Sequence, residues 1–220
     1  MSKVPEGRRS SARFLARMLP GAVAAPAGLV APCLTVPRRA PPKGRGWLHE
    51  ILFEGLRLQA RVEKGRVAFH DADGAPVTKA PARVAAALAA LPVNRAVIDG
   101  IAVVQAPGGA SDRAMLDADL AAGHGGRIVL FAFDLLHLDG FDIRAAPLAE
   151  RKRVLAALLS EAGEGVVAFS AHAEGEAGDF LSEAEALGLA GIVSKRADAP
   201  YRAGATGDWV AVAISRRPRR

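Results

Sequence analysis

Residue types that often carry catalysis or bind metals are present, but most of them lack the arrangement that such chemistry needs. The five histidines do not have the spacing of metal ligands, and no order of serine, histidine and aspartate supports a catalytic triad. Gly108–Gly109 and 123–126 lack the context of a phosphate-binding loop. Cys33 is the single cysteine, which excludes an intramolecular disulfide framework and a thiolate metal cluster. Any chemistry must therefore come from the charged blocks of the chain.

The most informative block runs from Trp47 to Val62 and reads WLHEILFEGLRLQARV. It resembles the first nucleotidyltransferase motif of ATP-dependent DNA ligases, and most closely the bacterial end-joining type. In that family a lysine of this motif attacks the α-phosphorus of ATP and takes up AMP. The resemblance places Leu52, which has no lone pair to attack with, at the position of that lysine.

Two further blocks extend the resemblance over most of the chain, from about residue 31 to 214. Residues 133–144, followed by 147–152, resemble motif IIIa and the helix after it, and residues 191–204 resemble motif IV and its loop. Ordered blocks at suitable spacing rarely arise by chance. The resemblance implies an α+β fold, namely a nucleotidyltransferase (ATP-grasp-like) adenylation domain with mainly antiparallel sheets and flanking helices.

The same alignment of motifs implies altered chemistry at six further positions, which are Glu54, Ala72, Ile101, Ala190, Ala211 and Ala213. Glu54 keeps the charge of an aspartate. The alanines at 72, 211 and 213 stand where the family has cations, and positions 101 and 190 stand where it has carboxylates. Because the cations and the carboxylates are absent together, no single charge is left uncompensated in a cleft of low dielectric constant. The fold is therefore expected to survive without its catalysis. Bound Mg²⁺ is not expected.

Four residues that the resemblance assigns to nucleotide contacts are retained: Glu50 beside the adenine, Phe133 stacked on it, and Arg57 and Lys195 on the ribose and phosphate side. The sequence demands no cofactor, but ATP or AMP binding is left open by these residues. A second interpretation makes Phe133 a core residue and the three charges partly exposed strand residues.

These residues need strands and helices to position them. Alternation from Leu56 to Val62, the turn Lys64–Gly65 and the run Arg66–His70 predict a hairpin. Helices are expected over 81–91, over 112–122 with Ser111 as N-cap, over 147–159 with its charged residues outward, and over 176–187. Further strands are expected over 96–105, in two pieces broken at Asp99–Gly100, and over 128–136, 166–170, 190–195 and 208–214.

The net charge of +6 is concentrated at the two ends of the chain. Residues 1–46 hold nine Lys and Arg against Glu6, and 216–220 hold four arginines, which leaves about −6 on the rest. We expect a disordered basic arm over 1–28, with a short helix over 11–19, an adenylation domain over 29–215, a basic tail over 216–220 and no OB-fold domain. DNA contacts are expected through the basic ends.

The preferred hypothesis is a catalytically inactive ligase-like domain that acts in DNA repair as a binding or scaffold module with a protein partner. Two alternatives are an active ligase with a displaced nucleophile, such as Lys43, Lys64 or Lys79, and a domain that binds ATP or AMP without turnover. No apolar run is long enough to cross a membrane, and a cytoplasmic location is expected.

Overall fold

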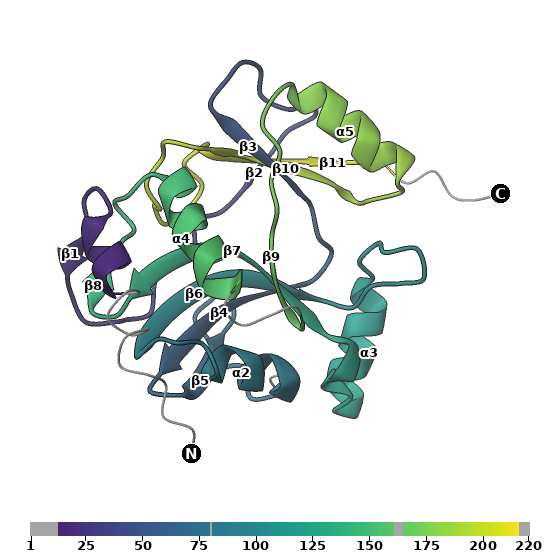
Figure 1. Ribbon diagram of the computed structural model, residues 1–220. Helices are drawn as coiled ribbons and strands as arrows, with labels where there is room; N and C mark the ends of the chain where they lie inside the picture. Colours follow the sequence, from purple (N-terminus) through teal and green to yellow (C-terminus); the bar gives the residue numbers. More distant parts are fainter. Residues whose placement is uncertain (1–12, 80, 161–164, 216–220) are drawn as a thin grey trace.

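The computed structural model describes residues 13–79, 81–160 and 165–215, and two β-sheets dominate it (Figure 1). Over these residues the larger sheet has seven strands in the order β1-β8-β7-β6-β4-β5, with β9 beside β7. They are β1 (Val23–Ala24), β4 (Leu56–Glu63), β5 (Arg66–His70), β6 (Arg95–Val103), β7 (Val129–Leu138), β8 (Phe141–Asp142) and β9 (Val167–Phe169). The smaller sheet has the order β2-β11-β10-β3, with β2 (Val36–Pro37), β3 (Trp47–Ile51), β10 (Gly191–Arg196) and β11 (Trp209–Ala213).

Most neighbouring strands in both sheets run antiparallel. Parallel pairs occur where β9 joins β7 and where β2 joins β11. Helices lie on the flanks of the sheets in Figure 1. The α+β class with mainly antiparallel sheets and flanking helices is therefore confirmed.

The hairpin of β4 and β5 forms as the sequence predicts. Leu58, Ala60 and Val62 of β4 point into the core, while the residues between them face the other way. The turn uses Lys64 and Gly65, both with positive φ (49° and 77°), as a two-residue hairpin loop requires.

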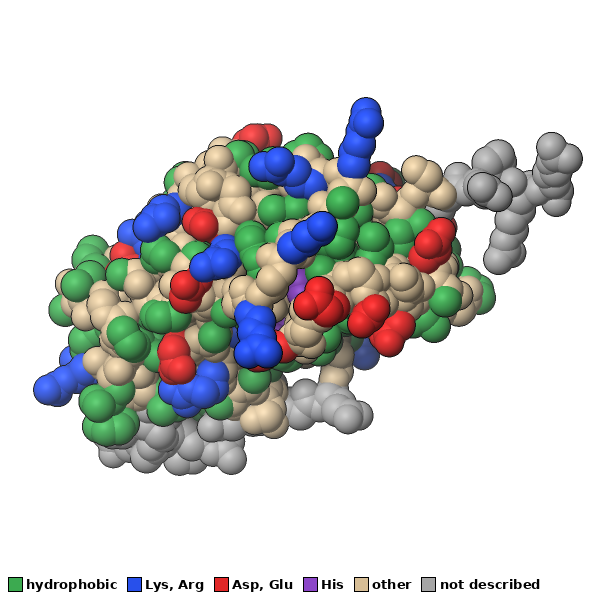
Figure 2. Space-filling model, turned by 90° about the horizontal axis from the view of Figure 1, so that it is seen from above, with side chains coloured by type: hydrophobic (Ala, Val, Ile, Leu, Met, Phe, Trp, Pro, Cys, Tyr) green, Lys and Arg blue, Asp and Glu red, His purple; other side chains and the backbone are tan. Residues whose placement is uncertain are grey.

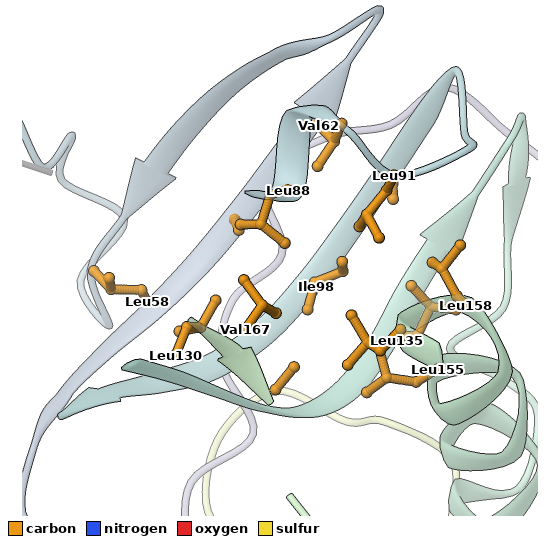
Figure 3. Packing of buried hydrophobic residues seen from close by; sticks show 14 of the residues in the cluster. Leu58, Val62, Leu88, Leu91, Ile98, Leu130, Leu135, Leu155, Leu158 and Val167 are labelled. Carbon is orange, nitrogen blue, oxygen red and sulfur yellow. The ribbon is translucent and has the colours of Figure 1, made fainter. Parts of the chain in front are cut away.

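The main hydrophobic core lies between the larger sheet and three helices, α2 (Ala82–Ala89), α3 (Arg113–Ala122) and α4 (Leu148–Ser160). Figure 3 shows side chains from α2, α4 and β9 gathered over those of β4, β6 and β7. A fourth helix, α5 (Ala177–Ala186), packs on the smaller sheet through Ala184, and a short 3₁₀ turn, η1, spans Gly125–Arg127. Each sheet thus buries one face under helices.

The region around Asp99 corrects the prediction of two strand pieces. β6 is one strand, and it stays continuous because register shifts against β7 between Val97 and Ile98 and between Asp99 and Gly100 absorb the irregularity. A Cβ at Gly100 would lie 2.9 Å from the Phe131 carbonyl oxygen. The glycine therefore permits close strand contact and does not end the strand.

The start of α3 also differs from the prediction, because Asp112 and not Ser111 is the N-cap. The Asp112 side chain accepts a hydrogen bond from the backbone N–H of Met115 (2.9 Å). Ser111 Oγ instead accepts the backbone N–H of Glu54 (2.8 Å) and so ties the loop after β3 to the helix.

The prediction of a disordered arm over 1–28 was wrong for residues 13–28. Residues 13–18 are helical, Ala16 and Leu19 are buried in the main core, and β1 pairs with β8. The short helix expected over 11–19 is present over residues 13–18, but its place in the core was not predicted because so short a helix forms only by packing. Residues 1–12 and 216–220 lie outside the described residues, so the arm and tail stay predictions there.

Among the described residues, no helix is both long and apolar enough to span a bilayer.

Candidate functional site

The pairing of β3 with β10 brings distant blocks of the sequence together. Glu50 lies opposite Val193, and the backbone N–H of Leu52 donates to the carbonyl of Gly191 (2.9 Å). Gly191 has φ of +149°, and a Cβ there would lie 2.1 Å from the carbonyl oxygen of Val212 and 3.1 Å from a Leu52 methyl carbon. The Val212 backbone and the Leu52 side chain thus leave no room for a side chain at position 191.

Three of the predicted altered positions lie on or beside strands β10 and β11 of the smaller sheet. Ala213 of β11 lies opposite Gly191, Ala211 lies two residues earlier on the same strand, and Ala190 directly precedes β10. None of these side chains can donate or accept a hydrogen bond. These three positions therefore supply no polar or charged side chain to this part of the smaller sheet.

A further predicted altered position, Ile101, lies on the larger sheet. It lies on β6 opposite Phe131 of β7 and packs against the cluster between the two sheets. The Phe53 ring stacks on the Phe131 ring, with centroids 4.2 Å apart and planes 19° from parallel. Glu54 follows Phe53 and keeps a charge at the edge, whereas exposed Ala72 lines a separate groove of about 430 Å³ near the β4 and β5 hairpin.

Glu50 lies at the centre of a buried network of charges. Lys152 Nζ donates to its Oε1 (2.9 Å), Lys195 Nζ donates to its Oε2 (3.0 Å), and the Ser170 hydroxyl also donates to Oε2 (2.7 Å). The exposed fractions are 2% for Glu50, 0% for Lys152 and 3% for Lys195. Lys152 also donates to the carbonyls of Ser170 (2.9 Å) and Phe133 (3.4 Å), so its three hydrogens are all used.

The pKa values in this network reflect the pairing of one carboxylate with two ammonium groups. Burial by itself raises the pKa of Glu50, but the charges of Lys195 and Lys152 outweigh burial and hold the pKa below its ordinary value. Burial lowers the pKa of Lys195, and Glu50 opposes this only in part because Lys152 repels the same ammonium group. The Glu50 carboxylate is therefore committed to structural ion pairs.

Arg57 belongs to a second network, on the larger sheet. It donates to Asp99 through Nε (3.1 Å) and Nη2 (2.6 Å), to the Cys33 carbonyl (2.6 Å) and to the Tyr201 hydroxyl (3.1 Å). The Tyr201 hydroxyl donates in turn to Asp99 (2.6 Å). Burial alone lowers the pKa of Arg57, but the Asp99 charge raises it overall, and burial raises the pKa of Tyr201 and takes that of Cys33 to about 11.

The two networks meet on the rings of Phe133 and Trp209. Lys195 Nζ lies 4.1 Å from the Phe133 centroid and 4.4 Å from that of Trp209, and Arg57 Cζ lies 5.4 and 5.7 Å from them. Phe133 is 7% exposed and packs edge-on against Trp209. The four retained residues do converge, and the interpretation of Glu50 and Lys195 as partly exposed strand charges was wrong.

In this arrangement the residues present do not fit a bound nucleotide with Mg²⁺. A purine stacked on Phe133 would compete with the cations that already lie over the ring, and the polar atoms of Glu50 are satisfied within the protein. The Asp99 carboxylate is engaged by Arg57 and Tyr201. Positions 101 and 190 offer no side-chain oxygen, which Mg²⁺ would need.

Lys152 is the site residue that sequence reasoning missed, because the charged residues of α4 were expected to face solvent. Arg151 and Lys152 are both 0% exposed, and Arg151 forms two hydrogen bonds of 2.8 Å with the equally buried Asp134. The signal lay in the spacing. Residues 151 and 152 fall three and four positions after Leu148, and thus on the apolar stripe of the helix.

Comparison with known proteins places this arrangement in a family. The model of the ATP dependent DNA ligase domain matches residues 37–212. The multifunctional non-homologous end joining protein LigD of Pseudomonas aeruginosa is 34% identical over 181 residues, which are 82% of this chain and 21% of that protein. A probable DNA ligase of Beutenbergia cavernae is 34% identical over 173 residues, or 74% of this chain and 33% of that protein.

Solved structures agree with the sequence relatives. Mycobacterial DNA ligase D, solved in complex with ATP and MES, matches with a TM-score of 0.70 and 26% identity over 83% of this chain and 60% of that one. The ligase domain of M. tuberculosis LigD matches with a TM-score of 0.70, 24% identity and coverages of 81% and 59%. This chain spans between a fifth and a third of the length of the two sequence relatives. Its fold, its motif order and these matches together show that the chain belongs to the ATP-dependent DNA ligase domain family.

Proposed function

We propose that this ligase-like adenylation domain does not transfer AMP and acts as a non-catalytic DNA-binding or scaffold module in DNA repair. The feature that carries the proposal is Leu52, which the motif resemblance places at the position of the attacking lysine and whose backbone N–H donates to the Gly191 carbonyl. A leucine side chain cannot attack phosphorus, and the alanines at 190, 211 and 213 cannot stabilise the charge that phosphoryl transfer develops.

Other lysines are poorly placed to replace the missing nucleophile. Lys152 and Lys195 are buried and bound to Glu50. Lys64 lies in the turn beyond β4, and eight strand residues at about 3.3 Å each separate it from the Leu52 end, whereas attack needs roughly 3 to 3.5 Å. Lys43 and Lys79 are exposed loop residues.

Incubation of the full chain with α-radiolabelled ATP and MgCl₂ tests the proposal. We expect no covalent label on the protein, with the ligase domain of the P. aeruginosa relative as positive control. Leu52→Lys should also remain unlabelled, because the residues at 101, 190, 211 and 213 still lack oxygens and cations. A label that stays on the wild-type protein after denaturation would refute the proposal and favour the displaced-nucleophile alternative.

Calorimetric titration with ATP and with AMP addresses the remaining alternative, which is nucleotide binding without turnover. We expect no heat of binding, because Lys195 and Arg57 lie over the ring on which a purine would stack. Binding that disappears in Phe133→Ala would instead support a nucleotide-sensing domain.

The names of the relatives support the DNA-repair part of the proposal. One is named a non-homologous end joining protein and another a probable DNA ligase. We propose that this chain acts in the cytoplasm in the same process, with DNA and a protein of that process as partners.

A further inference from the structure

The loop between β2 and β3 concentrates positive charge on the folded domain. Four of its eight residues from 38 to 45 are cationic, namely Arg38, Arg39, Lys43 and Arg45, and all four are exposed. The sequence has no acidic residue between Glu6 and Glu50. None of the four forms an ion pair with any residue that the structure describes.

This basic loop, residues 38–45, is held at both ends by the smaller sheet. The backbone N–H of Arg38 donates to the Ala211 carbonyl (2.9 Å), and that of Ala197 donates to the Gly46 carbonyl (2.9 Å). Pro41 and Pro42 restrict the backbone between these anchors. The four cations therefore belong to an ordered loop and lose less conformational entropy on binding than a free arm would.

The basic loop projects beyond the smaller sheet, at the top of Figure 1. Figure 2 views this face from above: Lys and Arg side chains stand out from it, and acidic side chains gather toward the side where α5 lies. Residues 171–190 carry five acids and no Lys or Arg. The face thus has an acidic part near α5, whereas elsewhere Lys and Arg side chains stand among scattered acidic ones.

We propose that the basic loop binds the phosphate backbone of DNA, an inference that rests on the proposed function. Guanidinium groups match phosphate oxygens in geometry, and three of the four cations are arginines. Protein interfaces generally need aromatic or apolar anchors, and residues 38–46 supply only one alanine and two prolines among polar and glycine residues. The composition therefore favours a polyanion over a protein surface.

The basic loop also lies beside the strand that resembles motif V. Pro37 pairs with Ala211, one of the two positions where the family has a lysine and this chain does not. Cations are thus absent from β11 but present on the adjoining exposed loop. This placement suits sequence-independent contact with a nucleic-acid backbone outside the pocket.

Binding of a fluorescent duplex DNA, followed by anisotropy from about 50 to 200 mM KCl, tests the inference. The test protein is the full chain with Arg38→Gln, Arg39→Gln, Lys43→Gln and Arg45→Gln. The matched control changes four exposed cations elsewhere, Lys64, Arg66, Lys79 and Arg83, to glutamine. A third variant changes Lys3, Arg8, Arg9 and the four arginines of 216–220, which separates the loop from the basic ends.

We expect the loop variant to bind at least about tenfold more weakly at low salt, and its slope of log K against log salt to flatten by about 0.9 for each phosphate that the loop no longer neutralises. The control should retain most of the affinity. Circular dichroism and thermal unfolding should match the wild type in every variant.

Four results would overturn the inference. If the wild type binds DNA and the loop variant binds equally well, the loop is not the binding surface, although the proposed function stands. If only the terminal variant binds more weakly, the basic ends are the binding surface. If the wild type binds no DNA at all, the DNA-binding part of the proposed function fails as well. Weaker self-association in the loop variant, with DNA binding intact, would assign the loop to the acidic face of a second copy.

Discussion

Glu50 and its two lysines form a buried network of ion pairs in the described part of the chain. A buried ion pair contributes little to stability relative to an apolar pair, but removing one partner leaves an uncompensated charge. Here one carboxylate compensates two buried ammonium groups. Glu50 is therefore the residue of the site on which stability depends most.

Glu50→Gln is expected to destabilise the protein by about 3 to 5 kcal/mol, because Lys152 and Lys195 would then share no counter-charge. Chemical denaturation at neutral pH measures the change. Glu150→Gln, whose partner Arg153 is exposed, is the control and should cost less than about 1 kcal/mol. Equal effects of the two variants would contradict a structural role for the buried network.

The same residue predicts the response of stability to acid. The folded pKa of Glu50 lies below its ordinary value of 4.5, so the unfolded chain binds more protons between the two values. Its contribution is complete above about pH 4.5 and is lost as the pH falls through the folded value. In Glu50→Gln the free energy of unfolding should fall less steeply as the pH is lowered than it does in the wild type. An unchanged pH dependence would mean that other carboxylates cause the loss of stability in acid.

At this scale the sequence predicted which residues would converge but not what they would do. Glu50, Phe133 and Lys195 could be selected from motif resemblance. The ion pairs that these residues form could not be predicted, because they depend on Lys152, which lies 102 residues from Glu50. An ion pair of that separation follows from tertiary packing and leaves no local pattern.

Among the secondary-structure elements, those with strong local signals were predictable. In the β4 and β5 hairpin the alternating apolar and polar residues and the turn residues predict the same structure, and the hairpin forms. Element ends were less certain. Ser111 and Asp112 are both good N-cap residues, and the choice between them depends on the contact of Ser111 with Glu54, which lies 57 residues away.

Removal of the Asp112 cap is expected to weaken α3. Asp112→Ala leaves the backbone N–H of Met115 without its acceptor and should cost about 1 kcal/mol. Urea denaturation followed by far-ultraviolet circular dichroism gives the difference. Asp117→Ala, which removes only an exposed ion pair with Arg113, should be neutral or slightly stabilising, and a larger destabilisation there would argue against the assigned cap.

The whole molecule includes a segment that the sequence assigned to a disordered arm. Residues 13–28 contribute two core side chains and an outer strand of the larger sheet. Residues 1–46 are rich in Ala, Pro, Gly and Arg, which favoured disorder, and the few apolar residues that pack lacked sustained periodicity. Composition averages over a window, whereas packing depends on individual side chains.

Leu19→Ala tests whether this segment is part of the cooperative fold. Leu19 is 4% exposed in the main core, and its truncation should cost about 2 to 5 kcal/mol in the global unfolding transition. Met18→Ala, at a side chain 65% exposed, should change stability little. Indistinguishable variants would mean that the segment does not fold with the rest of the domain.

The strand order of the smaller sheet has a consequence for synthesis on the ribosome. Pro37 pairs with Ala211, and β3 pairs with β10, so this sheet joins residues made early to residues made late. At about 5 to 20 residues per second, β2 waits on the order of ten seconds or more for its partner strand. The larger sheet can begin to assemble first, since β4 and β5 are joined by a tight turn. The unpaired early strands are thus exposed to chaperones and proteases during that interval, and the basic loop can gain its anchors only after Ala197 and Ala211 have been made.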